Sequence, residues 1–243
     1  NNRSIYWPRG KVLGGSSSIN AMVYVRGHKQ DYDEWNAVAP GWGWADVEPM
    51  FRRMENWLGQ PREERGRAGP LGITDVTDQV HPVTRAYIKA ASEAGIPFNP
   101  DYNSGDMEGA CFFQITTKNG IRSSTANTYL KTVAQRSNLC ILTGAFVTSV
   151  LFDGKTATGV SYVRGGKTLI AEAKREVILC GGAINTPKLL QLSGIGAAPL
   201  LNEMEIPVVI DQPHVGQNLI DHVGLELIYG ANVPTLNQLL RPL

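Results

Sequence analysis

Hydrophobic and polar positions along this chain follow a helical spacing in its first half and mainly an alternating, strand-like spacing after residue 138. Apolar residues, several of them tryptophans, recur at helical spacing on both sides of Pro40-Gly41, which predicts helical segments within residues 31–56. A second helix is predicted over residues 83–94, since Gly95 and the proline that follows it would stop the helix. A third is predicted over residues 124–134.

The second half is predicted to contain short strands that end in one longer apolar strand. Asp153-Gly154 is a hairpin signal between two β-type runs. Val177 to Cys180 is continuously apolar and runs into a glycine pair, as expected of a strand buried on both faces of a parallel sheet. A helix over residues 186–193 follows it. The expected strands cover residues 139–142, 147–152, 159–163, 169–171 and 176–180.

Two segments show neither the helical nor the strand-like spacing of apolar residues. Residues 60–72 are rich in Arg, Glu, Gly and Pro and predict an exposed loop or a crossing between domains. Residues 1–28 predict a glycine- and serine-rich loop that leads into the apolar run Ala21–Val25.

Composition excludes several classes of protein. The 243 residues are 42% hydrophobic and 19% charged, as in an ordinary globular protein. A net charge of +1 gives no electrostatic reason to expect nucleic acid or an anionic membrane as a partner. No apolar run reaches the ~20 residues of a transmembrane helix. The N-terminus does not resemble an export signal.

The cysteines and the ends of the chain give weaker indications. Cys111, Cys140 and Cys180 form no CxxC pair, which favours buried free thiols in a reducing compartment, hence the cytoplasm, over a disulfide framework or a zinc site. No metal site is expected. The chain has no initiator Met, and residues 235–240 look like the start of a helix, so both ends are interpreted as cuts within a longer protein.

The first segment with possible chemistry runs from Gly10 to Asn20 and contains paired glycines and three serines. Glycines let a backbone approach a ligand closely. The N–H groups of Gly15, Ser16 and Ser17 would form a concave donor surface suited to phosphate oxygens. A flexible turn is the alternative, and the segment matches neither the Walker phosphate loop nor GxGxxG.

The second segment runs from Gly181 to Gly196, where the apolar strand meets a tight glycine turn and a helix. Asn185 or Thr186 would cap this helix, with Pro187 in its first turn. Such a turn is a place where a cofactor lies over the carboxyl end of a sheet. An ordinary strand-to-helix connection explains it equally well.

These two segments carry a family resemblance. Residues 10–33 resemble the first signature of the glucose–methanol–choline oxidoreductases, and residues 182–196 resemble the second. Three further segments resemble the choline dehydrogenase-like branch of that family: Arg122–Ala126, Asn138–Val147 and Val215–His222. The resemblance spans essentially the whole chain.

The resemblance implies an α/β fold class: a Rossmann-like FAD-binding domain, incomplete here, with an α+β substrate domain. Residues 1–30 and 136–220 would be pieces of the FAD-binding domain. Residues 31–135 and 221–243 would be substrate-domain and crossing segments.

It also implies an FAD site. The loop would follow the FAD diphosphate and ribityl chain, the next residues would pack beside the flavin ring, and the main chain of a strand residue would meet the adenine. That strand residue could equally be an ordinary half-buried position. The expected FAD-binding residues are Val12, Gly14, Gly15, Ser16, Asn20, Ala21, Met22, Val23 and Val147. Some relatives carry a flavin-linked histidine where this chain has Ile19, so the FAD is expected to be held non-covalently.

No catalytic residue is expected in this chain. In the family, a histidine takes the proton of the substrate hydroxyl while hydride passes to flavin N5, and a base with a pKa near neutrality suits this task. That histidine would lie beyond Leu243, and a GxGxxG unit would precede Asn1. The histidines present are expected to have other roles, although one could line the substrate side; they are His28, His81, His214 and His222.

Two other kinds of site have less support in the sequence. A Ser/His/Asp hydrolase built on Ser16 or Ser193 has no GxSxG turn to support it. Three tryptophans could stack on a ligand, but the helical segments around them favour a packed corner; they are Trp35, Trp42 and Trp44.

The resemblance therefore predicts an FAD-dependent dehydrogenase or oxidase acting on the CH–OH group of a small alcohol. A non-redox lyase that keeps FAD, such as a hydroxynitrile lyase, and a catalytically inert fragment are the alternatives. The identity of the alcohol, the electron acceptor and the oligomeric state stay open.

Overall fold

The computed structural model describes residues 3–222 and 224–238 of the chain. The chain separates into two compact units, which are described one at a time: unit 1 contains residues 1–139 and 230–243, and unit 2 contains residues 140–229. The division into cofactor and substrate regions predicted above concerns function and stays a prediction.

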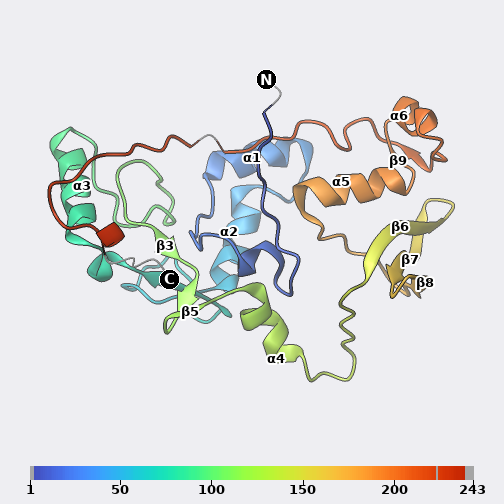
Figure 1. Ribbon diagram of the computed structural model, residues 1–243, viewed down its shortest axis with the longest axis horizontal. Coiled ribbons are helices and arrows are strands. Elements are labelled where there is room, and N and C mark those ends of the chain that lie inside the picture. Colours follow the sequence, from blue (N-terminus) through green and yellow to red (C-terminus); the bar gives the residue numbers. More distant parts are fainter. Residues whose placement is uncertain (1–2, 223, 239–243) are drawn as a thin grey trace. The chain divides into compact units, whose positions relative to one another are not determined.

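Unit 1 begins with two helices joined at an aromatic corner. Helix α1 covers Lys29–Val38 and α2 covers Trp44–Met54, which confirms the helices expected within residues 31–56 (Figure 1). The ring of Tyr32 lies with its centroid 5.6 Å from those of Trp35 and Trp44 and 5.9 Å from that of Phe51. Trp42 contacts Trp35 at 6.3 Å. The tryptophans therefore form the packed helical corner that was predicted.

Two other predicted helices of unit 1 are also present. Helix α3 covers Pro82–Glu93, one residue earlier at each end than predicted. The helix expected over residues 124–134 contains a π-helical turn, Ala126–Leu130, which continues into the short helix α4, Lys131–Val133. Short 3-10 turns occur at Gly15–Ser18, Thr77–Gln79 and Leu236–Gln238. The end of the helix expected over residues 235–240 falls outside the described residues.

The strands of unit 1 are short and surround a small core. Strand β1, Glu55–Trp57, pairs in parallel with β2, Leu71–Asp75, and β2 pairs antiparallel with β3, Gln114–Ile115. Strand β4, Thr117–Lys118, pairs antiparallel with β5, Ile121–Arg122. Tyr24, Trp57 and Ile73 form the buried apolar cluster.

The prediction of an exposed loop over residues 60–72 is wrong at three positions. Strand β2 begins at Leu71, so the last two residues of that segment belong to a sheet. Arg65 is only 3% exposed. A buried guanidinium is tolerated when carboxylates neutralise it, and Glu55 and Asp101 both contact Arg65.

Unit 2 contains an antiparallel meander of three strands, which Figure 1 shows as adjacent arrows: β6, Phe146–Asp153; β7, Thr156–Arg164; and β8, Lys167–Glu172. The Asp153-Gly154 hairpin is confirmed, with Gly154 at φ +57°. Helix α5, Gly182–Leu192, follows. The unit also contains helix α6, Ala198–Glu203, and the parallel pair β9, Ile195–Gly196, and β10, Ile210–Asp211.

Two predicted strands are wrong. Residues 139–142 and 176–180 are not strands, and no described strand pairs with either of them. The burial expected for the second segment is also wrong, because Ile178 is 73% exposed. A β-strand requires a hydrogen-bonding neighbour, and an apolar run without one cannot form a sheet.

Helix α5 also starts earlier than predicted. Its first residue is Gly182, with Gly181 at the N-cap, so Pro187 lies inside the helix and not in its first turn. Neither Asn185 nor Thr186 caps it. The predicted stop at Ser193-Gly194 is confirmed, since Gly194 adopts φ +85° directly after the C-cap.

The cysteines are free but less buried than expected. Cys140 and Cys180 are exposed, and Cys111 is half-buried, with a thiol pKa raised by that burial. Among the described helices, none combines the length and apolar content that crossing a bilayer requires. The described residues contain no group of three or more His, Cys, Asp or Glu side chains placed to hold a metal ion.

Candidate cofactor site

The predicted FAD loop in unit 1 is a compact turn that depends on glycine. Gly14 and Gly15 adopt φ values of +88° and +54°, in the left-handed region where side chains cost energy. A Cβ atom on Gly10 would lie 2.2 Å from the carbonyl oxygen of Gly15, closer than atoms can approach. A larger residue at Gly10 would therefore force the loop to change shape, and one at Gly14 or Gly15 would have to adopt a left-handed backbone conformation.

The internal hydrogen bonds of this loop correct one detail of the sequence reasoning. The Gly15 N–H donates to the Val12 carbonyl at 2.9 Å. The hydroxyl of Ser17 donates to the Gly14 carbonyl at 2.5 Å, and that of Ser18 donates to the Leu13 carbonyl at 2.9 Å. These groups hold the turn together, so the Gly15 N–H does not belong to an anion-binding surface.

The outer face of the loop is open. No atom lies within 4 Å of the place where a Cβ of Gly15 would be. Val12, Ile19 and Val23 are 57%, 48% and 36% exposed. A cavity of about 520 Å³ also adjoins Gly14, on the side of the loop that faces Thr125 and Ala126. Open backbone beside exposed apolar side chains fits a ligand such as FAD, which joins a charged diphosphate to flat apolar rings.

The segment that follows, Asn20–Val23, is held in an unusual conformation. Met22 has φ +65°, a region rarely adopted by residues other than glycine. Its N–H donates to the Asn20 side-chain oxygen at 3.1 Å, and its carbonyl accepts from the Thr116 N–H at 2.8 Å. Val23 forms an isolated antiparallel bridge with Ile115. Strain of this kind persists where the surroundings enforce it and is frequent at functional sites.

Residues far along the chain hold this loop and segment from behind. Nη1 of Arg122 donates to the carbonyl and the side-chain oxygen of Asn20, both at 2.8 Å, and to the Ser17 carbonyl at 3.3 Å. The Thr125 N–H donates to the Ser17 hydroxyl at 3.0 Å, and the Thr125 hydroxyl donates to the Gly14 carbonyl at 3.2 Å. Residues 122–126 carry part of the family resemblance, but no sequence pattern assigns them to the site.

A buried ionic cluster lies at the other end of the same segment. Glu55 is fully buried and accepts from Arg65 Nε at 2.9 Å and Arg65 Nη2 at 3.0 Å, and also from Arg26 Nη2. Nη1 of Arg65 donates to Asp101 Oδ1 at 2.8 Å. The Arg65 guanidinium lies 3.9 Å above the Trp57 ring. Although burial lowers the pKa of Arg65, the two carboxylates outweigh it and raise that pKa above its ordinary value.

The surroundings of this cluster fix the backbone directly after Val23. The Tyr24 carbonyl accepts from the Tyr102 hydroxyl at 2.9 Å and from Asn103 Nδ2 at 3.0 Å. The Arg26 N–H donates to the Asn103 side-chain oxygen at 2.8 Å. Burial, with the nearby Glu55 carboxylate, raises the pKa of the Tyr24 phenol to about 12. Residues 20–26 are therefore rigidly supported on both sides of Met22.

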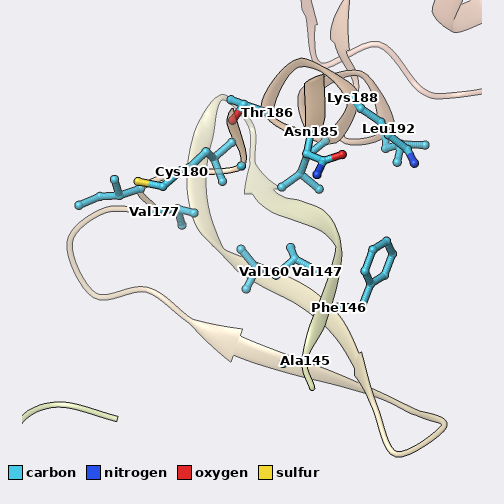
Figure 2. A pocket seen from close by; sticks show the side chains of 14 residues that line it. Ala145, Phe146, Val147, Val160, Val177, Cys180, Asn185, Thr186, Lys188 and Leu192 are labelled. Atoms are coloured by element: carbon cyan, nitrogen blue, oxygen red, sulfur yellow. The ribbon is translucent and has the colours of Figure 1, made fainter. Parts of the chain in front are cut away.

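Unit 2 contains a separate cavity of about 470 Å³ that brings two sequence features together. Val147 on β6, 36% exposed, and Gly181 before α5 both line it. Figure 2 shows Val147 and Val160 on the sheet, with Asn185 and Thr186 of the helix beside them. The lining is mainly apolar, which suits a flat aromatic group. The predicted role of the Val147 main chain stays a prediction, and so does a cofactor shared by the Gly14 and Gly182 turns, which lie in different units.

The four histidines have local contacts or are exposed. Nδ1 of His28 accepts from the Gln30 N–H at the start of α1, and Nδ1 of His81 accepts from the Val83 N–H at the start of α3, each at 3.2 Å. His214 is exposed. Asp221 accepts from the backbone N–H of His222 at 2.9 Å. These contacts are structural.

Comparison with known proteins finds matches along most of the chain. The sequence pattern of the GMC oxidoreductase family matches residues 1–224. The chain is 45% identical over 241 residues to an alcohol dehydrogenase [acceptor] of Pseudomonas putida, covering 97% of this chain and 43% of that protein. It is 44% identical over 243 residues to the mitochondrial choline dehydrogenase of Mus musculus, covering 99% of this chain and 41% of that protein.

A solved structure gives the same result for the fold. An FAD-dependent oxidoreductase from Chaetomium thermophilum superposes with a TM-score of 0.81 at 37% identity, covering 88% of this chain and 39% of that one. The chain thus spans less than half the length of the proteins it matches. These similarities confirm the predicted α/β flavoprotein fold class and FAD as the cofactor.

Proposed function

Since this chain belongs to the GMC oxidoreductase family, we propose that it is part of an enzyme that uses FAD to oxidise the CH–OH group of a small alcohol. The observation that carries the proposal is the supported loop in unit 1. It combines left-handed glycines, an open backbone face at Gly15 and a strained, hydrogen-bonded Met22. A loop that only connects two elements would not need these three features in combination.

In this proposal the chain holds the cofactor mainly through its backbone. The Gly14–Ser16 turn and Val12 meet the diphosphate and ribityl part of FAD, because the open face at Gly15 admits a ligand without hindrance. Asn20, Ala21, Met22 and Val23 lie beside the flavin ring. In unit 2, Val147 and the cavity beside it receive the adenine. Residues 1–30 and 136–220 then serve the cofactor, and residues 31–135 and 221–243 serve the substrate side.

Bound FAD supplies the acceptor for a hydride from the alcohol carbon. The base that takes the hydroxyl proton is proposed to lie outside this chain, since His28 and His81 are engaged as helix caps and neither His214 nor His222 occupies the position expected from the family. A choline-like alcohol is the proposed substrate class, given the similarity to choline and alcohol dehydrogenases. A cytoplasmic location is retained as part of the proposal, supported by three free thiols.

The FAD is proposed to be held without a covalent bond at position 19. Ile19 offers no nucleophile to the flavin ring, whereas an imidazole there could form a bond to it. Acid or heat denaturation should therefore release intact FAD into the supernatant. Flavin that stays with the denatured chain at this position, located by peptide mapping, would contradict the proposal.

The test uses the whole flavoprotein that contains this chain. The protein is purified and its visible spectrum is recorded. It is then mixed, in the absence of oxygen, with choline and with a series of other small alcohols. Loss of the oxidised flavin absorbance is expected on addition of the substrate. Bound FAD that no alcohol bleaches would favour the non-redox lyase alternative, and absence of bound flavin would favour a catalytically inert protein.

A further inference from the structure

The contacts between the predicted FAD loop and the segment Arg122–Thr125 have no role in the function proposed so far. They join residues about a hundred positions apart: Ser17 and Arg122 are separated by 105 residues, and Gly14 and Thr125 by 111. Contacts across such a separation are not needed to form a local turn. All of them lie within unit 1.

Arg122 makes three hydrogen bonds to the loop and to Asn20, and all three use a single nitrogen. Nη1 donates to the Asn20 carbonyl and side chain at 2.8 Å and to the Ser17 carbonyl at 3.3 Å. The Asn20 side-chain oxygen that it contacts is the same atom that accepts from the Met22 N–H at 3.1 Å. One guanidinium nitrogen therefore connects the glycine turn to the residue held at positive φ.

The charge of Arg122 is not used elsewhere in the described part of the chain. Among the ion pairs of the described residues, none involves Arg122, although four other arginines of unit 1 contact carboxylates: Arg26, Arg52, Arg62 and Arg65. A cationic donor strengthens hydrogen bonds to carbonyl oxygens. The Arg122 side chain is thus arranged to hold amide oxygens of the loop and not to neutralise an acid.

Thr125 completes the attachment at the glycine turn. Its N–H donates to the Ser17 hydroxyl, which in turn donates to the Gly14 carbonyl, and its own hydroxyl donates to that same carbonyl. Gly14 also packs against this segment, since a Cβ there would lie 3.1 Å from the Cβ of Ala126. The position of the Gly14 peptide is therefore set by the segment and not by the loop alone.

We propose that Arg122 and Thr125 are positioning residues that hold the Gly14–Met22 backbone in its FAD-binding form before the cofactor arrives. The inference rests on the proposed function, because it assigns a role at the same cofactor site. Preorganisation of this kind lowers the entropy lost on binding and so tightens it. Removing these contacts should weaken FAD binding and change the surroundings of the flavin ring, while the rest of unit 1 stays folded.

The test compares Arg122→Met, Arg122→Lys and a control, Arg67→Met, in the whole flavoprotein. Arg67 is exposed in the same unit, and within the described part of the chain its side chain forms no hydrogen bond or ion pair with the loop. The apoprotein of each variant is titrated with FAD, and the visible circular dichroism of the bound flavin is recorded. Arg122→Met should raise the Kd for FAD about tenfold or more and alter the flavin spectrum, since a single charged hydrogen bond is worth about that much.

Lysine gives the sharper result. Because the three contacts use one nitrogen, a single ammonium group could supply them, so Arg122→Lys should recover most of the affinity and the spectrum. Thr125→Ser, which keeps the hydroxyl, should likewise bind FAD more tightly than Thr125→Val, which has the same shape without it.

The possible outcomes distinguish a failure of the proposed function from a failure of the positioning role. Flavin absent from the unchanged protein would overturn both the proposed function and this inference. If the unchanged protein holds FAD but Arg122→Met binds it as tightly as Arg67→Met, the positioning role is wrong and the function stands. Arg122→Met could also lose thermal stability as an apoprotein along with its FAD affinity, while Arg122→Lys restores neither. That result would show a general structural role for Arg122 and would also overturn the inference.

Discussion

Neutralising Glu55 should destabilise unit 1 more than any other conservative change to a carboxylate in it. Glu55 is fully buried and accepts four hydrogen bonds: one from Arg26, two from Arg65, and one from the Gly66 N–H at 2.7 Å. The substitution Glu55→Gln keeps the size of the side chain but removes its charge. Its amide nitrogen would also face an arginine donor where a carboxylate oxygen now accepts.

The magnitude follows from the charges of the cluster. Two arginines and two carboxylates are buried together, Arg26, Arg65, Glu55 and Asp101, and their formal charges cancel. Losing one carboxylate leaves a net positive charge in a place without water. Removing one partner of a buried pair typically costs about 3–5 kcal/mol, a large part of the ~5–15 kcal/mol that stabilises a whole domain.

Urea unfolding followed by tryptophan fluorescence measures this loss. Trp57 is a suitable reporter, because the Arg65 guanidinium stacks on its ring. The matched control is Glu64→Gln, an exposed carboxylate one position from Arg65, which should change the free energy of unfolding by less than about 0.5 kcal/mol. The double variant Glu55→Gln/Arg65→Met should lose less than the sum of its single variants. A Glu55→Gln loss no larger than that of the control would refute the reasoning.

Three further predictions concern single positions. Gly14→Ala should weaken FAD binding more than Gly15→Ala, since a Cβ on Gly14 would lie 2.4 Å from the Ser18 hydroxyl oxygen while Gly15 faces open space; FAD titration of the two apoproteins decides, and equal affinities would contradict the geometry. The folded state keeps the Tyr24 proton up to a pKa of about 12, above its ordinary value, so stability should fall as pH rises from 10 towards 12. Tyr24→Phe should flatten that fall in urea unfolding and the exposed control Tyr6→Phe should not. Ser193→Ala should cost about 1–3 kcal/mol, because it removes the hydroxyl that accepts from the buried Val150 N–H at 2.8 Å; a loss below about 0.5 kcal/mol in urea unfolding would contradict the importance of this contact.

Much of the local structure could be predicted from the sequence because its causes are local. The helices around Pro40-Gly41 and the helix over residues 83–94 follow from apolar spacing and from residues that stop a helix. The Asp153-Gly154 hairpin follows from a residue that tolerates positive φ. The glycines of the candidate site belong to the same class, since their backbone angles are a property of the residue itself.

The wrong strands and the wrong exposure of Arg65 concern features that need a partner elsewhere in the chain. Residues 176–180 have the composition of a buried strand, but a strand exists only where another strand accepts its hydrogen bonds. Arg65 looks like an exposed residue of a polar loop, and it is buried because Glu55 and Asp101, 10 and 36 residues away, neutralise it. No local pattern reveals such a pairing.

The sequence by itself thus determined the helices, the turns and the glycine-rich segments that carry the family resemblance, because residue type alone limits backbone angles and burial over short distances. The tertiary structure decided which residues support the candidate site. Arg122 and Thr125 reach the glycine loop, and the buried ionic cluster anchors the backbone after Val23. Those contacts depend on side-chain positions more than a hundred residues apart, or on charges that cancel only once the chain has folded around them.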